Sequence, residues 1–192
     1  MEELTDLQLI EEVRNGKRRA FTELMRRYQQ RVYWAARRIV GTHEDADDIA
    51  QETFVKAYTA LGDFRGESSF FTWLYRIAVN LSLNAVRKRQ VVSYLRENDI
   101  INRFFPASDD PSREVEFKET ESRLQEAIAR LPEKQRAVFV MRYFDEMSYE
   151  EISEVMKTSV GGLKANYFHA LRKVREYMTN EIPSGPTGHH GK

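Results

Sequence analysis

Three carboxylates on one predicted helix form the first group in this sequence that could do chemistry. At about 100° per residue, Asp45, Asp48 and Glu52 fall on one face of a helix over residues 44–61, opposite an apolar stripe. The stripe comprises Ala46, Ala50, Phe54, Ala57, Tyr58 and Leu61. The carboxylates could hold a divalent metal, dock on a basic partner or face solvent. A metal site would need a second pair of carboxylates on a facing helix, but the helix over residues 18–40 offers only Glu23 and that over residues 69–90 offers none. We therefore expect no catalytic residue, metal or other cofactor.

An aromatic ring, two amides and several cations share a face of the predicted helix over residues 69–90. They are Trp73, Arg76, Asn80, Asn84 and Arg87, followed by Lys88. Because cations neutralise phosphates, rings stack on bases and amides read base edges, this face suits single-stranded nucleic acid. The preceding loop sets an exposed Phe64 and Arg65 between two glycines, which favours a pocket for an unstacked base. Alternatively, Trp73 is a core residue and the cations form a solvated helix end.

A helix-turn-helix pattern follows near the C-terminus. Ser148 and Glu151 form a capping box for a short helix, and a turn of three residues leads to a longer helix over residues 160–178. The outer face of the longer helix carries Lys164, Ala165, Phe168, His169, Arg172 and Arg175. Phe168 either contacts a thymine methyl or the sugar backbone, or packs on a neighbouring helix.

Helical periodicity positions all these groups, and no segment alternates apolar and polar residues long enough to indicate a strand. Helices are predicted over residues 5–15, 18–40, 44–61, 69–90, 118–130, 133–144, 148–156 and 160–178. The chain has no cysteine, which excludes a disulfide scaffold, a thiolate zinc site and a cysteine nucleophile. It also lacks a signal peptide and an apolar run long enough for a membrane span, so we expect a cytoplasmic protein.

The fold expected is all-α, with two small helical domains joined by a flexible acidic linker. The predicted ranges are 1–94 and 118–182 for the domains, 95–117 for the linker, and 183–192 for a disordered tail. The second domain contains the helix-turn-helix.

The formal net charge is zero, yet charge is segregated along the chain. Residues 17–42 carry a net +7, from eight cations and one acid, whereas residues 43–52 carry −5 with no cation. Net positive segments also cover residues 53–92 and 158–192. A chain of this kind can meet a polyanion and a basic partner on different surfaces. The patterns above assign no role to the 17–42 block.

Four motifs, in order, resemble an extracytoplasmic-function (ECF, group 4) sigma factor of bacterial RNA polymerase, of the sigma-E type. They are Asp48-Ile49-Ala50-Gln51-Glu52-Thr53-Phe54, the loop Phe64-Arg65-Gly66 with the segment 71–80, Leu131-Pro132-Glu133-Lys134-Gln135-Arg136, and Ser148-Tyr149-Glu150-Glu151-Ile152. The resemblance extends over residues 4–178, nearly the whole chain.

The resemblance implies a promoter-specificity subunit that acts as a monomer, has no membrane contact of its own, and belongs to a stress or envelope response. Its implied partners are promoter DNA, an anti-sigma factor that holds it inactive, also by sequestration at the membrane, and core RNA polymerase. The polymerase contacts would be the clamp of the largest subunit and the flap of the second largest. The implied clamp-binding residues are Asp48, Gln51, Glu52 and Phe54.

The resemblance also divides promoter recognition between two surfaces. The −10 element would be melted, with a flipped base held near Phe64 and Asn80, and further contacts from Arg65, Trp73, Arg76, Asn84, Arg87 and Lys88. The −35 element would be read as duplex. Family members often carry Ser-Arg and a further Arg where this chain has Ala165-Asn166 and His169, so the −35 readers shift to Lys164, Asn166, Phe168, His169, Arg172 and Arg175.

Two other function classes remain as alternatives. A stand-alone helix-turn-helix regulator would bind duplex DNA tightly as a symmetric dimer without polymerase. A helical metal-dependent hydrolase built on the acidic row would turn over nucleotides with magnesium and lose activity in Glu52→Gln.

Overall fold

The computed structural model describes residues 4–95 and 115–180, which contain eight α-helices, one 3-10 turn and no strand. The elements are α1 (Asp6–Arg14), α2 (Arg18–Val40), α3 (His43–Ala60), η1 (Leu61–Asp63), α4 (Phe70–Leu95), α5 (Val115–Ala129), α6 (Glu133–Tyr143), α7 (Tyr149–Met156) and α8 (Val160–Asn180). This confirms the all-α prediction. Most of the predicted linker and the whole predicted tail lie outside the described residues.

Local sequence explains where several helices begin and end. Thr5 with Gln8 and Ser148 with Glu151 form complete capping boxes at the starts of α1 and α7, the second as predicted. Gly41, with φ 89°, ends α2 in the left-handed conformation that glycine adopts without strain. Within the described residues, no helix is both long and apolar enough to cross a membrane.

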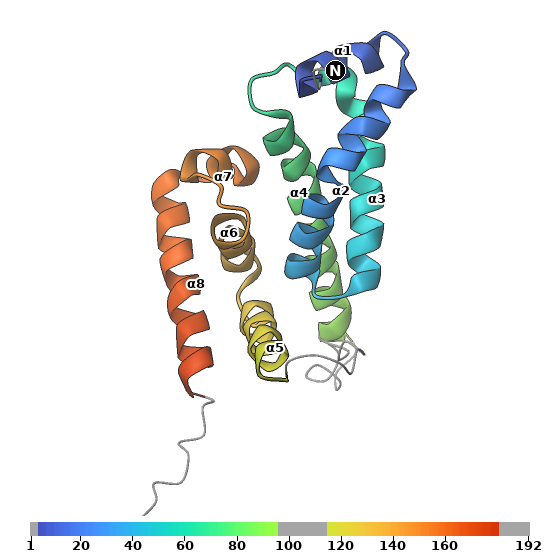
Figure 1. Ribbon diagram of the computed structural model, residues 1–192. Coiled ribbons are helices and arrows are strands. Elements are labelled where there is room, and N and C mark those ends of the chain that lie inside the picture. Colours follow the sequence, from blue (N-terminus) through green and yellow to red (C-terminus); the bar gives the residue numbers. More distant parts are fainter. Residues whose placement is uncertain (1–3, 96–114, 181–192) are drawn as a thin grey trace, which may run out of the picture.

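The N-terminal half is a bundle of α2, α3 and α4 that α1 crosses at one end (Figure 1). Its core gathers Leu9 and Ile10 of α1, Leu24 of α2, Phe54 of α3 and Leu74 of α4. In the C-terminal half, α8 packs against α5, α6 and α7. Helix α3 lies at one edge of the molecule and α8 at the other (Figure 1).

The two halves pack directly against each other. Helix α2 contacts α5 and α6, and α4 contacts α6 and α7, so that one buried cluster continues from the N-terminal half into the C-terminal half. Tyr75, Val79 and Leu83 of α4 join this cluster together with Phe139 and Met147. Part of the buried surface of α4 therefore depends on tertiary packing, because the C-terminal half covers the side that carries these residues.

The start of α8 offers a test of helix propensity. Ser159 Oγ accepts a hydrogen bond from the Gly162 amide at 3.3 Å, and two glycines follow in the first turn. A methyl group at Gly161 would meet nothing within 4 Å, whereas at Gly162 it would lie 3.3 Å from the side chains of Ser159 and Thr158. We expect Gly161→Ala to raise the free energy of unfolding by about 0.5–1 kcal/mol and Gly162→Ala to raise it less. Urea denaturation of both variants measures the difference, and an equal gain in both would contradict the packing argument.

Candidate functional site

The acidic face of α3 is exposed. Asp48, Gln51 and Glu52 lie on the solvent side of the helix, where Glu52 forms an ion pair with Lys56 at 3.3 Å. Phe54 is 5% exposed and packs in the core of the N-terminal half. Its ring faces α2 and not the solvent, so its implied contact with the clamp stays a prediction that would require the ring to leave the core.

Two large side chains that the predicted row of carboxylates does not include extend the acidic face. Val55 is 65% exposed and Tyr58 is 44% exposed. The apolar stripe predicted for residues 44–61 includes Tyr58. In the structure Tyr58 lies at the margin of the core, where its ring packs edge-on against Phe21 at 5.0 Å between centroids. We define the clamp face, named only for the contact that the resemblance implies, as Asp48, Gln51, Glu52, Val55 and Tyr58. It combines negative charge with apolar area, which is suitable for a protein partner with a basic and apolar surface.

Asp45 joins the start of α3 to α4. Its carboxylate accepts hydrogen bonds from Arg89 of α4 and from Thr42, the N-cap residue of α3. Within the described ranges, no group of three or more His, Asp or Glu side chains could hold a metal ion. The geometry thus gives no support to the hydrolase alternative.

The outer face of α4 presents the predicted polar set to solvent. Asn80, Asn84, Arg87 and Lys88 are exposed, and Arg76 is half-buried. Arg87 Nε donates to Glu133 Oε1 of α6 at 2.8 Å, so one cation of this set is tied to the C-terminal half. The remaining side chains form a continuous row of amides and cations along the helix.

The loop between α3 and α4 buries its aromatic residue, Phe64. Phe64 is 5% exposed, and its ring packs edge-on against Phe70 and Trp73 at 5.9 and 5.4 Å between centroids. The expectation of an exposed Phe64 is wrong, because these rings cover it. The Arg14 guanidinium also fixes the loop, since it donates to the carbonyl of Leu61 at 3.1 Å and to the carbonyl of Phe64. Trp73 is half-buried at the rim of the same cluster, while Arg65 is exposed.

The helix-turn-helix forms as predicted. Lys157 adopts the left-handed conformation with φ 51° and turns the chain from α7 into α8. Leu163, Ala170 and Val174 are buried on the inner side of α8. The outer side exposes Lys164, Ala165, Phe168, His169, Arg172 and Arg175.

Phe168 and Asn166 of α8, both predicted −35 contacts, differ in how accessible their side chains are to a ligand. Phe168 is 63% exposed, so its ring does not pack on a neighbouring helix and is available to a ligand. Asn166 is half-buried, and its amide donates to the Gly162 carbonyl at 2.9 Å. A base contact from Asn166 would first have to break this hydrogen bond.

Part of the 17–42 basic block is neutralised by nearby carboxylates. Arg27 donates to Glu23 and Asp6, both at 3.0 Å, and thereby joins α2 to α1. Hydrogen bonds from Arg26 and Arg27 lower the pKa of Glu23 to about 2. Arg27 therefore has a structural role, because it holds α1 and α2 together.

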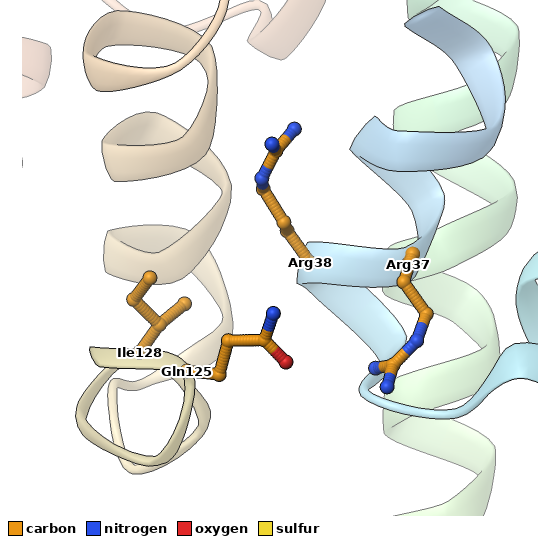
Figure 2. Close-up of a pocket in the computed structure, with 4 residues that line it drawn as sticks. All are labelled: Arg37, Arg38, Gln125 and Ile128. Carbon is orange, nitrogen blue, oxygen red and sulfur yellow. The ribbon is translucent and has the colours of Figure 1, made fainter. Parts of the chain in front are cut away.

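The C-terminal arginines of the block lie where the two halves meet. Arg37 is buried and donates to the Gly41 carbonyl, while the Arg38 guanidinium lies 4.1 Å from the centre of the Phe144 ring. The two side chains leave α2 in different directions (Figure 2). With Gln125 and Ile128 they line a space of about 10 Å³, which holds about one water molecule and no larger ligand.

Comparison with protein families and known proteins gives consistent matches over both halves. Residues 24–91 match the family model "Sigma-70 region 2", and residues 121–174 match "Sigma-70, region 4". These matches fall inside the two predicted domains, whose boundaries remain predictions.

Curated relatives match over almost their whole length. The chain is 38% identical to an RNA polymerase sigma-H factor of Pseudomonas aeruginosa over 178 residues, which are 88% of this chain and 91% of the relative. It is 36% identical to an ECF RNA polymerase sigma-E factor of Haemophilus influenzae over 188 residues, or 94% and 97% of the two chains.

Solved structures share the fold. CnrH in complex with the cytosolic domain of CnrY matches with a TM-score of 0.68 and 25% identity, over 90% of this chain and 96% of that one. The sigma factor RpoE of Bartonella quintana, in complex with the anti-sigma factor NepR, matches with a TM-score of 0.67 and 20% identity, over 84% and 98%.

Proposed function

The chain belongs to the ECF sigma factors of RNA polymerase, and on this basis we propose how its three exposed faces share the work of promoter-specific initiation. The clamp face on α3 binds core polymerase, the outer face of α4 binds the melted −10 element, and the outer face of α8 binds the −35 duplex. The single observation that supports this division is the exposure of three chemically different faces on three separate helices. Chemistry is then performed by the polymerase, and this chain supplies recognition only.

Each face suits its proposed ligand. The −10 face offers exposed amides for base edges and cations for phosphates, with little apolar area. The −35 face lies on the second helix of a helix-turn-helix, which enters the major groove in proteins of this class, and its exposed Phe168 can contact a thymine methyl. The buried Phe64 means that a flipped base would need the aromatic cluster of Phe64, Phe70 and Trp73 to open, or would rest against exposed Arg65 outside it.

We also propose control by an anti-sigma factor and contact of the C-terminal half with the polymerase flap. The support is the family itself and the similar RpoE of Bartonella quintana, which forms a complex with the anti-sigma factor NepR. The predicted location is the bacterial cytoplasm.

Reconstitution tests the function. Core polymerase with this protein should start transcripts at defined sites in a fragment library of its own genome, and core alone should not. If no site-specific transcript forms, the sigma-factor proposal is wrong. If the chain alone forms a symmetric dimer on duplex DNA with high affinity, the stand-alone regulator is correct instead.

Asn80→Ala should separate polymerase binding from promoter melting. Asn80 is exposed on α4, whereas the clamp face lies on α3, so the core affinity should stay within about twofold of wild type. Loss of an amide that reads a base costs about 1–3 kcal/mol, so open complexes should decrease about fivefold or more. Permanganate reactivity of unpaired thymines measures melting. Equal melting by Asn80→Ala and wild type would remove Asn80 from the −10 face.

A further inference from the structure

One side chain of α1 holds the carbonyl groups of the turn that follows α3. Helix α1 crosses the bundle at the end where α3 leads into α4 (Figure 1). Arg14 Nη2 lies within hydrogen-bonding distance of three carbonyl oxygens, those of Leu61 at 3.1 Å, of Gly62 at 3.4 Å and of Phe64. Carbonyls at the C-terminal end of a helix lack donors within the helix and carry a partial negative charge, so a guanidinium is well suited to this position.

Helix α1 gives Arg14 a fixed position. Ile10 is 0% exposed and packs in the core of the N-terminal half. Near the start of the same helix, the Asp6 carboxylate accepts a hydrogen bond from Arg27 of α2 at 3.0 Å. The guanidinium of Arg14 is therefore carried by a helix that is anchored on the core and on α2.

The loop that Arg14 contacts has a glycine near each end. Gly66 adopts φ 74°, and a methyl group at Gly62 or at Gly66 would meet nothing within 4 Å. Glycine leaves the backbone more conformational freedom than any other residue, and no packing restricts these two. The buried ring of Phe64 and the hydrogen bonds from Arg14 therefore provide much of the order of the loop over residues 61–66.

The hydrogen bond to the Phe64 carbonyl also orients the peptide group that leads into Arg65. The chain has no cis peptide bond in the described residues, and a trans peptide group is planar with its C=O and N–H in opposite directions. Because the Phe64 carbonyl points to Arg14, the amide N–H of Arg65 points away from it. Arg65 is exposed and belongs to the proposed −10 contacts. Arg14 thus fixes the backbone from which the Arg65 side chain extends.

We propose that Arg14 is a positioning residue for the −10 element, which keeps the loop over residues 61–66 in the closed form that receives an unpaired base against Arg65. The proposal rests on the proposed function, because the unpaired base belongs to promoter DNA. Arg14 itself does not contact the base. It lowers the conformational cost of base binding, since the loop is already ordered before the DNA arrives.

Hydrogen exchange of the free full-length chain tests whether Arg14 holds the loop. The Phe64 amide donates to the Leu61 carbonyl at 3.3 Å, and in Arg14→Ala it should exchange about threefold to tenfold faster, with unchanged exchange inside α3 and α4. Arg14 is exposed, so the thermal midpoint should stay close to that of wild type. Arg19→Ala is the matched control, because it removes the same side chain at an exposed position of α2. Unchanged exchange in Arg14→Ala would overturn the proposal.

The base preference of the holoenzyme tests the connection to the −10 element. Promoters with each of the four bases at every −10 position are transcribed by core polymerase with the wild-type chain or one of its variants. We expect Arg14→Ala to lower the preference for one base, at a single −10 position, by about threefold to tenfold, with unchanged preferences at the −35 element and unchanged core affinity. Arg14→Lys should restore part of this preference, since an ammonium group also donates to carbonyls. Arg19→Ala should behave as wild type.

Two results with the holoenzyme would overturn the proposal. One is a wild-type base preference at every −10 position in Arg14→Ala, and the other is an equal loss of transcription at all promoters, which a merely structural role would cause. If the wild-type holoenzyme starts no specific transcript, the proposed function fails, and the exchange of the Phe64 amide then decides separately whether Arg14 holds the loop.

Discussion

Glu52→Lys should weaken binding to core polymerase by about ten- to a hundredfold. Glu52 is exposed at the centre of the clamp face, between Asp48 and Val55 along the helix, and it pairs with the exposed Lys56 of the same helix. Reversal of a charge that faces a basic partner replaces attraction by repulsion, which costs about 1–3 kcal/mol at a partly desolvated interface. Titration of fluorescently labelled chain with core polymerase measures the loss.

The fold should not change in this variant. Exposed ion pairs one helical turn apart contribute about 0.3–0.5 kcal/mol, so the thermal midpoint of Glu52→Lys should stay close to that of wild type. Glu121→Lys is the matched control, because it makes the same exchange at an exposed position on α5 and changes the total charge equally. If Glu121→Lys weakens core binding as much, the effect is one of net charge, and the clamp face is not specific. If Glu52→Lys binds normally, the assignment of α3 is wrong.

Arg136→Met should lower the free energy of unfolding by about 3 kcal/mol. Arg136 is 4% exposed and donates to the carbonyls of Ile39 at 2.7 Å, of Leu131 at 3.1 Å and of Ala129. Burial, together with the charge of Arg89, lowers its pKa to about 10, so the guanidinium stays charged at neutral pH. Methionine fills similar space but leaves buried carbonyl oxygens without a donor, each at a cost of about 1–3 kcal/mol before relaxation.

Calorimetry measures this loss, and a loss of about 3 kcal/mol corresponds to a fall of about 6–12 °C in the thermal midpoint for a chain of this size. Arg130→Met is the matched control, because Arg130 is an exposed arginine in the same region whose guanidinium lies over the ring of Tyr177 at 4.6 Å. Its loss should cost less than about 1 kcal/mol. A similar midpoint for both variants would show that the buried hydrogen bonds of Arg136 add little to stability.

Local sequence patterns correctly predict the helix starts and helix faces that depend on residues close together in the chain. The capping box of Ser148 and Glu151 starts α7, and the 3.6-residue period correctly separates buried Leu163 and Ala170 from exposed Phe168 on α8. The all-α class follows from the same period. These predictions succeed because they rest on contacts within one or two helical turns.

Errors arose where burial depends on packing between distant segments. Phe64 looked exposed because glycines flank it, yet the rings of Phe70 and Trp73 cover it. Phe54 carried a family role but lies in the core, whereas Val55, one position further along α3, faces solvent. Periodicity places Phe54 in the apolar stripe, where the structure has it, and the clamp role came from the resemblance, which carries no information on burial.

No pattern in the sequence predicts that the N-terminal and C-terminal halves pack against each other. Tyr75 is buried because the C-terminal half covers its side of α4, where it joins the shared apolar cluster and its hydroxyl donates to Asp145, seventy residues later. The same packing explains why Arg38, from the basic block without an assigned role, lies over Phe144. Pairings of this kind depend on tertiary structure and not on local pattern.

Photocrosslinking from two positions of the chain in one promoter complex shows which promoter element each of the two helices contacts. A photoreactive amino acid replaces Asn84 on α4 or Ala165 on α8, both exposed beside the proposed base-reading residues, and the crosslinked nucleotides are mapped in the complex with core polymerase. We expect crosslinks from position 84 to the unpaired strand of the −10 element and from position 165 to the −35 duplex. Crosslinks from both positions to the same element, or from neither to promoter DNA, would contradict this division of promoter recognition.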